Sequence, residues 1–136
     1  MSQKVINGIA HVGISVTDLA RSMEFYTKML GFDVIEECEL QDENGVCKIA
    51  FLKCENLCLE LFQLPKDGMR AKGRIDHLSM CVDNIEESYR MLLEKGIDFI
   101  DKEIQFAPNM FPKGTKWVNF KGPDGEILEL NQMIMG

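Results

Sequence analysis

Two segments of the chain, residues 9–16 and 75–82, alternate between hydrophobic and small or polar residues. This period of two is typical of a strand with one buried face. Each segment is followed by hydrophobic residues at helical spacing that end at a glycine, Gly31 in the first case and Gly96 in the second. The candidate helix N-caps are short polar residues: Thr17, Asp18, Asp83 and Asn84. Both halves of the chain are therefore predicted to begin as a strand followed by a helix.

Shorter strand-like runs follow each predicted helix. The predicted strands are residues 33–38, 46–53 and 57–64 in the first half and 98–104, 116–121 and 126–133 in the second. Turn residues separate them at 43–45 and 123–125. Residues 65–73 form the one linker-like stretch, so we expect a first module at 6–64 and a second at 74–133. The predicted fold class is α+β.

The two halves also repeat each other in sequence. At an offset of 66 residues His11 aligns with His77, and at an offset of 69 Glu60 aligns with Glu129. The chain contains 2 histidines, and both occupy the same place in the repeat. A module of about 60 residues with one helix covers one face of its sheet and is marginal by itself. The two modules are therefore expected to pack together.

Composition and charge narrow the function. With 136 residues, 46% of them hydrophobic, the chain is long and apolar enough to form a hydrophobic core. A formal charge of −7 disfavours nucleic acid or an anionic membrane as a partner. Neither a signal peptide nor an apolar run of about 20 residues is recognisable, so we expect a cytoplasmic protein. The 5 cysteines are odd in number and lie mostly in strand-like runs, so they are expected to be reduced.

The repeated histidines and glutamates are candidate metal ligands. Strand alternation directs the leucines beside Glu60 and Glu129 toward the helix and the two carboxylates toward the opposite, open face, which His11 and His77 share. Two imidazoles and two carboxylates suit zinc or nickel, with cobalt or manganese as substitutes, and leave positions of an octahedral ion for substrate. Singly, each residue has an ordinary structural interpretation, and the repeat is what favours a metal site. Asp76 is expected at the surface or beside His77 rather than among the ligands.

Four motifs carry a resemblance that spans nearly the whole chain. They are HVGISVTDLARSMEFYTKMLGF, LCLELFQ, IDHLSMCVDNIEESYRMLLEKGI and FKGPDGEILEL. The sequence resembles the vicinal oxygen chelate superfamily, which includes glyoxalase I, bleomycin-resistance proteins and dioxygenases. The resemblance implies a single domain over residues 1–136, with two tandem βαβββ modules whose mixed sheets form a cleft. It also implies metal ligands at His11, Glu60, His77 and Glu129, a set similar to that of bacterial glyoxalase I.

This resemblance implies a divalent-metal-dependent lyase or isomerase of the glyoxalase I (lactoylglutathione lyase) type. Such enzymes transfer a proton beside a carbonyl through a metal-bound enediolate. By analogy with glyoxalase I, Glu129 is the preferred base and Glu60 its symmetric partner. The expected substrate is a thiol adduct or an acyl-CoA. Ser15 and Leu64 stand where glyoxalase I has an arginine and an asparagine that hold glutathione, so the resemblance does not extend to those contacts.

Two other functions stay open at this point. One is an isomerase similar to methylmalonyl-CoA epimerase, and the other is a non-enzymatic small-molecule binding protein of the drug-resistance type. The residues expected to line the substrate pocket are Ser15, Phe62, Ser79, Asn131, Phe111 and Trp117. Residues 105–117 are interpreted as a lid or an interface. We expect a homodimer, and the sequence leaves open whether the site forms within one chain or between two.

Overall fold

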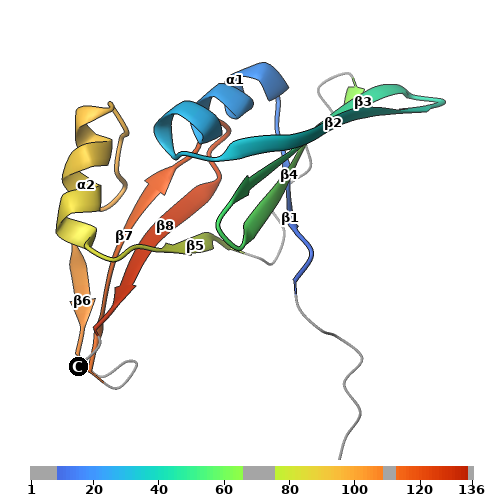
Figure 1. Cartoon of the computed structure of the whole chain (residues 1–136). Coiled ribbons are helices and arrows are strands. Elements are labelled where there is room, and N and C mark those ends of the chain that lie inside the picture. Colours follow the sequence, from blue (N-terminus) through green and yellow to red (C-terminus); the bar gives the residue numbers. More distant parts are fainter. Residues whose placement is uncertain (1–8, 66–75, 109–112, 135–136) are drawn as a thin grey trace, which may run out of the picture. The chain divides into compact units, whose positions relative to one another are not determined.

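The chain folds into two compact units, Met1–Arg70 and Ala71–Gly136, that follow the same plan (Figure 1). The computed structural model describes residues 9–65, 76–108 and 113–134, so the predicted linker at 65–73 lies almost wholly outside the described residues. No helix in the described ranges is long and apolar enough to cross a membrane.

The first unit is a four-stranded mixed sheet with one helical segment. Its elements are β1 (Val12–Ser15), α1 (Leu19–Glu24), the π-helical turn η1 (Phe25–Met29), β2 (Asp33–Asp42), β3 (Gly45–Cys54) and β4 (Leu57–Gln63). The strand order is β1-β4-β3-β2, with β1 parallel to β4 and the other neighbours antiparallel. The first strand of the unit therefore lies directly beside its last.

The second unit repeats this topology. Its elements are β5 (Leu78–Cys81), α2 (Ile85–Glu94), β6 (Gln105–Ala107), β7 (Thr115–Lys121) and β8 (Ile127–Met133). The strand order is β5-β8-β7-β6, again with the first strand parallel to the last. Two mixed sheets of four strands with few helices confirm the predicted α+β class and the predicted repeat.

The helices begin and end at the residues that the sequence marks. Asp18 caps α1 and Asn84 caps α2, and each side chain accepts a hydrogen bond from the backbone N–H three residues further on. Gly31 and Gly96 have φ angles of 84° and 90°, a left-handed conformation that glycine adopts without strain. Local sequence chemistry therefore sets the limits of both helical segments.

A glutamine on the last strand of each unit holds the start of its helix. Leu19 N–H donates to Gln63 Oε1 at 2.7 Å, and Ile85 N–H donates to Gln132 Oε1 at 2.8 Å. These amides belong to the first turn, where no backbone carbonyl of the helix is available to accept them. The same pair of contacts in both units fixes each helix to the strand that carries the candidate glutamate.

The core of each unit lies between its helix and the inward face of its sheet. Helix α1 packs on β3 and β4, and α2 packs on β7 and β8. The strand residues of these two faces are almost fully buried: Ala50, Leu52, Leu59, Leu61, Val118, Phe120, Leu128 and Leu130. Because successive strand residues point to opposite faces, the residues between them are directed away from the helix. Glu60 and Glu129 are among those residues.

The predicted strand at residues 98–104 is wrong. The strand of the second unit that pairs with this edge of β7 is β6, which begins at residue 105. Asp101 Oδ2 accepts hydrogen bonds from the backbone N–H and the side-chain amide of Asn119, and Ile100 N–H donates to the backbone oxygen of Asn119. These contacts occupy the edge of β7 that a longer strand would use. The chain therefore makes one isolated bridge to β7, between Phe99 and Phe120, and turns before the continuous pairing of β6 begins.

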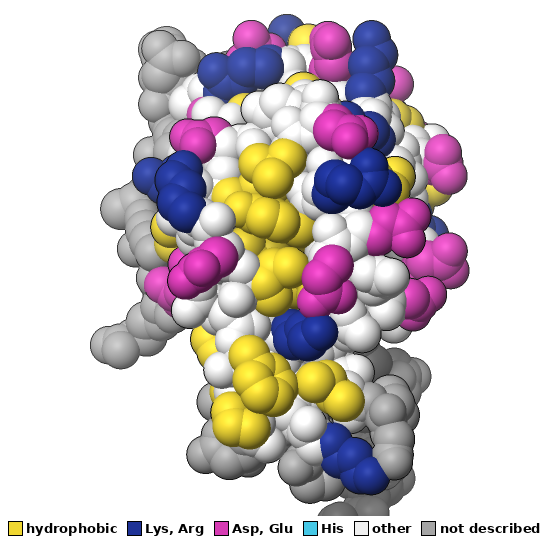
Figure 2. Space-filling model, turned by 90° about the vertical axis from the view of Figure 1, so that its left-hand side faces the viewer, with side chains coloured by type: hydrophobic (Ala, Val, Ile, Leu, Met, Phe, Trp, Pro, Cys, Tyr) yellow, Lys and Arg dark blue, Asp and Glu magenta, His cyan; other side chains and the backbone are white. Residues whose placement is uncertain are grey.

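Several large hydrophobic residues of the second unit remain exposed. They are Met91, Leu93, Ile100, Phe106 and Met133. Figure 2 shows hydrophobic side chains gathered in a band, with acidic and basic side chains along its borders. These five side chains are therefore exposed at the surface and are not part of the core between α2 and the sheet.

Candidate functional site

In the first unit, the structure brings together the predicted histidine and glutamate. His11 immediately precedes β1, and Glu60 lies on the neighbouring strand β4, where its register partner is Gly13. His11 Nε2 is 3.6 Å from Glu60 Oε1. The His11 ring packs edge-on against Phe51, with 5.5 Å between ring centroids. The pair is thus formed by residues 49 positions apart in sequence through the parallel pairing of β1 and β4.

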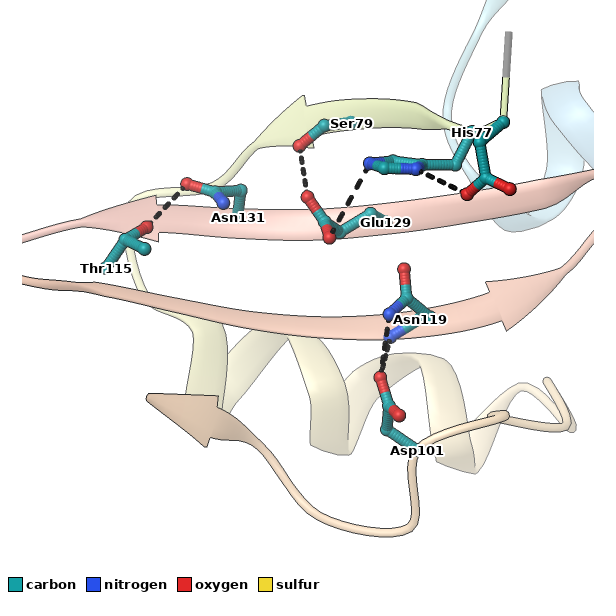
Figure 3. A network of polar contacts seen from close by, with 8 residues as sticks. His77, Ser79, Asp101, Thr115, Asn119, Glu129 and Asn131 are labelled. Carbon is teal, nitrogen blue, oxygen red and sulfur yellow. Dashed lines mark hydrogen bonds and ion pairs between the residues drawn. The ribbon is translucent and has the colours of Figure 1, made fainter. Parts of the chain in front are cut away.

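The second unit places its own histidine and glutamate in the same way. His77 immediately precedes β5, and Glu129 lies on β8 opposite Ser79. His77 Nε2 is 3.9 Å from Glu129 Oε2. Figure 3 shows His77, Ser79 and Glu129 directed toward one another across these two strands. The side chains of both histidines, His11 and His77, remain about 40% exposed, so their rings are accessible to a ligand.

Two further polar contacts hold the pair of the second unit. Asp76 Oδ2 lies 2.9 Å from His77 Nδ1, and Ser79 Oγ donates to Glu129 Oε1 at 2.7 Å. A neutral imidazole that donates its Nδ1–H to Asp76 carries its lone pair on Nε2, the nitrogen nearest Glu129. Such a carboxylate contact is the usual way of orienting a histidine that binds a metal.

A separate pair of polar residues, Asp101 and Asn119, lies beside the strand of Glu129. Asn119 is the register partner of Glu129 on β7, and its backbone N–H and Nδ2 donate to Asp101 Oδ2 at 2.8 and 2.9 Å. Figure 3 shows Asn119 on the strand next to that of Glu129. Sequence reasoning missed both residues. One sequence feature could have indicated Asn119: it is a polar residue between two core positions, Val118 and Phe120, and so faces away from the helix.

The other predicted pocket residues are distributed over both units. In the first unit, Ser15 and Phe62 are register partners on β1 and β4. The buried Ser15 hydroxyl has no hydrogen-bond partner in the part of the chain that the structure describes. In the second unit, Thr115 Oγ1 donates to Asn131 Oδ1 at 2.9 Å. Trp117 is the register partner of Asn131.

The predicted lid at residues 105–117 has sheet structure at both ends. Gln105 pairs with Trp117 and Ala107 with Thr115 in the antiparallel ladder of β6 and β7. Phe111, the remaining predicted pocket residue, lies outside the described residues. The described part of this segment is therefore the edge of the second sheet.

The donor atoms of each pair suit a divalent cation. Two ligands held by one zinc ion at about 2.0–2.2 Å lie roughly 3–3.5 Å apart. The observed separations of 3.6 and 3.9 Å approach this spacing to within about half an ångström. Within the described residues, no group of three or more histidine, cysteine or acidic side chains is placed to hold a metal ion. One unit by itself thus offers two protein ligands, fewer than the three or four that zinc sites use.

The fold and this repeated pair can be compared with known proteins. The family model of the Glyoxalase/Bleomycin resistance protein/Dioxygenase superfamily matches residues 8–130. The chain belongs to this superfamily. The match confirms the family that the sequence motifs resemble. Members of the superfamily generally depend on a divalent metal ion and bind small-molecule substrates.

Relatives within the superfamily cover most of the chain. It is 33% identical over 127 residues to the uncharacterized protein YwbC of Bacillus subtilis, a match that covers 91% of this chain and 96% of that protein. It is 30% identical over 130 residues to the mitochondrial methylmalonyl-CoA epimerase of Homo sapiens, covering 90% and 72%. The crystal structure of a glyoxalase family protein from Enterococcus faecalis is similar with a TM-score of 0.78 and 28% identity, covering 94% and 99%.

Proposed function

We propose that this protein is a divalent-metal-dependent lyase or isomerase that moves a proton on a carbon atom next to a carbonyl group. The proposed metal ligands are His11, Glu60, His77 and Glu129. The observation that carries the proposal is the imidazole–carboxylate pair that recurs at equivalent positions of both units. Zinc or nickel suits this mixture of nitrogen and oxygen donors, and cobalt or manganese can replace them.

The bound cation would act as a Lewis acid that stabilises negative charge on the substrate oxygens. The imidazoles would supply nitrogen ligands, and Asp76, whose Oδ2 lies 2.9 Å from His77 Nδ1, would orient the ring of His77. Glu60 and Glu129 are the proposed proton acceptors, because a carboxylate beside the substrate carbon can take a proton and return it. The cation would thus stabilise the negative charge, and the glutamates would transfer the proton.

The proposed substrate is a thiol adduct or an acyl-CoA, because both contain an acidic carbon beside a carbonyl. A glyoxalase I-type reaction is the first candidate. An epimerase acting on a 2-methyl-acyl-CoA is the second, and the 30% identity to human methylmalonyl-CoA epimerase supports it. Ser15 and Leu64, which replace the glutathione-holding residues of glyoxalase I, favour a thiol other than glutathione for the first candidate.

Two measurements test the proposal. Elemental analysis of the purified protein should find about one equivalent of divalent metal per set of four ligands, and His77→Ala should lose most of it. Deuterium incorporation from solvent into methylmalonyl-CoA, compared with consumption of a hemithioacetal, separates the two reactions. Glu39→Gln, at an exposed position of β2, is the matched control and should retain metal and activity. A wild-type protein that binds no divalent metal and exchanges neither probe would refute the proposal and favour a binding protein of the drug-resistance type.

A further inference from the structure

We infer that the two imidazole–carboxylate pairs have different tasks: Ser79 holds Glu129 in place as a fixed ligand, and Glu60 is the carboxylate that carries the proton. This inference rests on the proposed function. It differs from the analogy with glyoxalase I, which makes Glu129 the preferred base. It follows from contacts within each unit, because the pair of the second unit is hydrogen-bonded to neighbouring side chains, whereas the pair of the first unit has no such hydrogen bond to any described residue.

The Glu129 carboxylate is held by a hydrogen bond. Oε1 accepts the hydrogen bond of the Ser79 hydroxyl at 2.7 Å, and Oε2 faces His77 Nε2 at 3.9 Å. A hydrogen bond to a charged group is stronger than one between neutral groups and fixes the orientation of the acceptor. Turning Glu129 toward a substrate carbon would break the contact with Ser79. Its geometry therefore suits a ligand that stays in one orientation.

Glu60 lacks the equivalent restraint. Its register partner on the parallel neighbouring strand is Gly13, in the position where Glu129 has Ser79. Among the described residues, no side chain donates a hydrogen bond to Glu60, and its one polar contact is His11 Nε2 at 3.6 Å. Rotation of the Glu60 carboxylate therefore breaks no hydrogen bond to a described side chain. This is the freedom that a proton carrier needs.

The neighbouring residues of the second pair are also more polar than those of the first. Asp76 contacts His77 through Nδ1, whereas Ala10 stands before His11 and has no polar side chain. The cross-strand neighbour of Glu60 on β3 is Phe51, while Glu129 faces Asn119 on β7. The second pair is thus contacted by two polar side chains, Asp76 and Ser79, whereas the first has an alanine, a glycine and a phenyl ring at the corresponding positions.

The C–H bond beside the substrate carbonyl breaks, the proton goes to a carboxylate oxygen of Glu60, and the electron pair stays on the substrate as an enolate. Glu60 then returns that proton, or a deuteron taken up from solvent, to the adjacent carbon in the glyoxalase-type reaction. In the epimerase-type reaction the planar enolate must present its other face to Glu60 first, because return to the original face regenerates the substrate. No oxidant or reductant is involved. Glu129 keeps its contact with Ser79 in both steps, so Ser79 is a positioning residue and not a catalytic one.

The glycine in the first unit allows a reciprocal experiment. A Cβ at Gly13 would lie 3.6 Å from Glu60 Oε1 and 3.5 Å from Phe62 Cε1, which are ordinary contact distances. Gly13→Ser therefore fits and brings a hydroxyl within reach of Glu60, as Ser79 does for Glu129. Gly13→Ala is the matched control for the added Cβ. In the second unit Ser79→Ala removes the hydroxyl, and Ser79→Thr restores it in a strand-compatible residue.

Two readouts separate the two tasks: affinity for Co²⁺ alone by titration calorimetry, and solvent-deuterium exchange into methylmalonyl-CoA and into a hemithioacetal. Ser79→Ala should weaken Co²⁺ binding about tenfold or more, and Ser79→Thr should recover most of that affinity. Gly13→Ser should keep Co²⁺ affinity within about threefold and slow exchange about tenfold or more relative to Gly13→Ala. Circular dichroism of each variant establishes that it folds before either readout is compared.

Each result decides between the inference and its alternative. Gly13→Ser that exchanges as fast as Gly13→Ala, or Ser79→Ala with unchanged Co²⁺ affinity, would overturn the inference while leaving the proposed function intact. A wild-type protein that binds Co²⁺ but exchanges neither probe refutes the proposed reaction, and the Ser79 variants then decide the anchoring of Glu129 by affinity alone. A wild-type protein that binds no Co²⁺ refutes the metal site, and the inference with it.

Discussion

Removing the glutamine that caps a helix start should destabilise the protein measurably. In Gln132→Ala the N–H of Ile85, a residue with 0% exposure, loses the acceptor that lies 2.8 Å away. A buried donor left without a partner costs about 1–3 kcal/mol. For a chain of 136 residues unfolding cooperatively, with about 2.1 cal/mol/K of unfolding entropy per residue, a loss of about 2 kcal/mol lowers Tm by roughly 7 °C.

The assay is thermal and urea unfolding followed by circular dichroism. Gln132→Glu keeps an acceptor oxygen and places negative charge at a helix N-terminus, which is favourable, so we expect it within about 0.5 kcal/mol of wild type. Gln41→Ala, at an exposed position of β2, is the control for loss of a glutamine and should change stability by less than about 0.5 kcal/mol. If Gln132→Glu is as unstable as Gln132→Ala, or Gln132→Ala melts like wild type, the hydrogen bond does not contribute as argued.

Three further predictions concern packing and charge. Lys116 donates to Glu86 at 2.8 Å and holds the pKa of that carboxyl below its usual range. A lowered folded-state pKa adds stability above the ordinary glutamate range that is lost as pH falls through the lowered value. The Tm advantage of wild type over Glu86→Gln should therefore be present at neutral pH and vanish in strong acid; an unchanged advantage there would contradict it. Leu59→Ala, at a position with 0% exposure, should cost about 2–5 kcal/mol in urea unfolding, and a loss below about 1 kcal/mol would contradict its core placement. Asp101→Ala should speed amide hydrogen exchange at Asn119, whose N–H it leaves without its acceptor, and unchanged exchange would exclude that role.

Much of the fold was predictable because its signals are local. Alternation in β4 and β8 separates core leucines from the outward glutamates, and short polar residues mark the helix starts at Asp18 and Asn84. The internal repeat gave a further prediction that local patterns cannot give: equivalent positions in the two halves should adopt equivalent structures, as they do. Strand β2 runs to Asp42, four residues beyond its predicted end, because its pairing with β3 continues to the hairpin turn at Gly45.

The candidate site was only partly predictable, because its contacts depend on register between distant strands. Ser79 and Glu129 are 50 residues apart in sequence, and the residues around each of them do not indicate that the two form a hydrogen bond. Asp101 lies in a segment predicted as strand, and its two hydrogen bonds to Asn119 exist because the chain turns there instead. Alternation indicates which face a side chain takes, but it does not select the partner with which the side chain pairs.

The parallel pairing of first and last strands has a consequence for biosynthesis. Histidine and glutamate of each unit are 49 and 52 residues apart in the chain, and they meet only when β4 has docked beside β1, or β8 beside β5. When only the early part of a unit has been synthesised, its histidine is therefore present but the glutamate that pairs with it has not yet been translated. Each histidine–glutamate pair is thus completed by one of the last residues of its own unit to be synthesised.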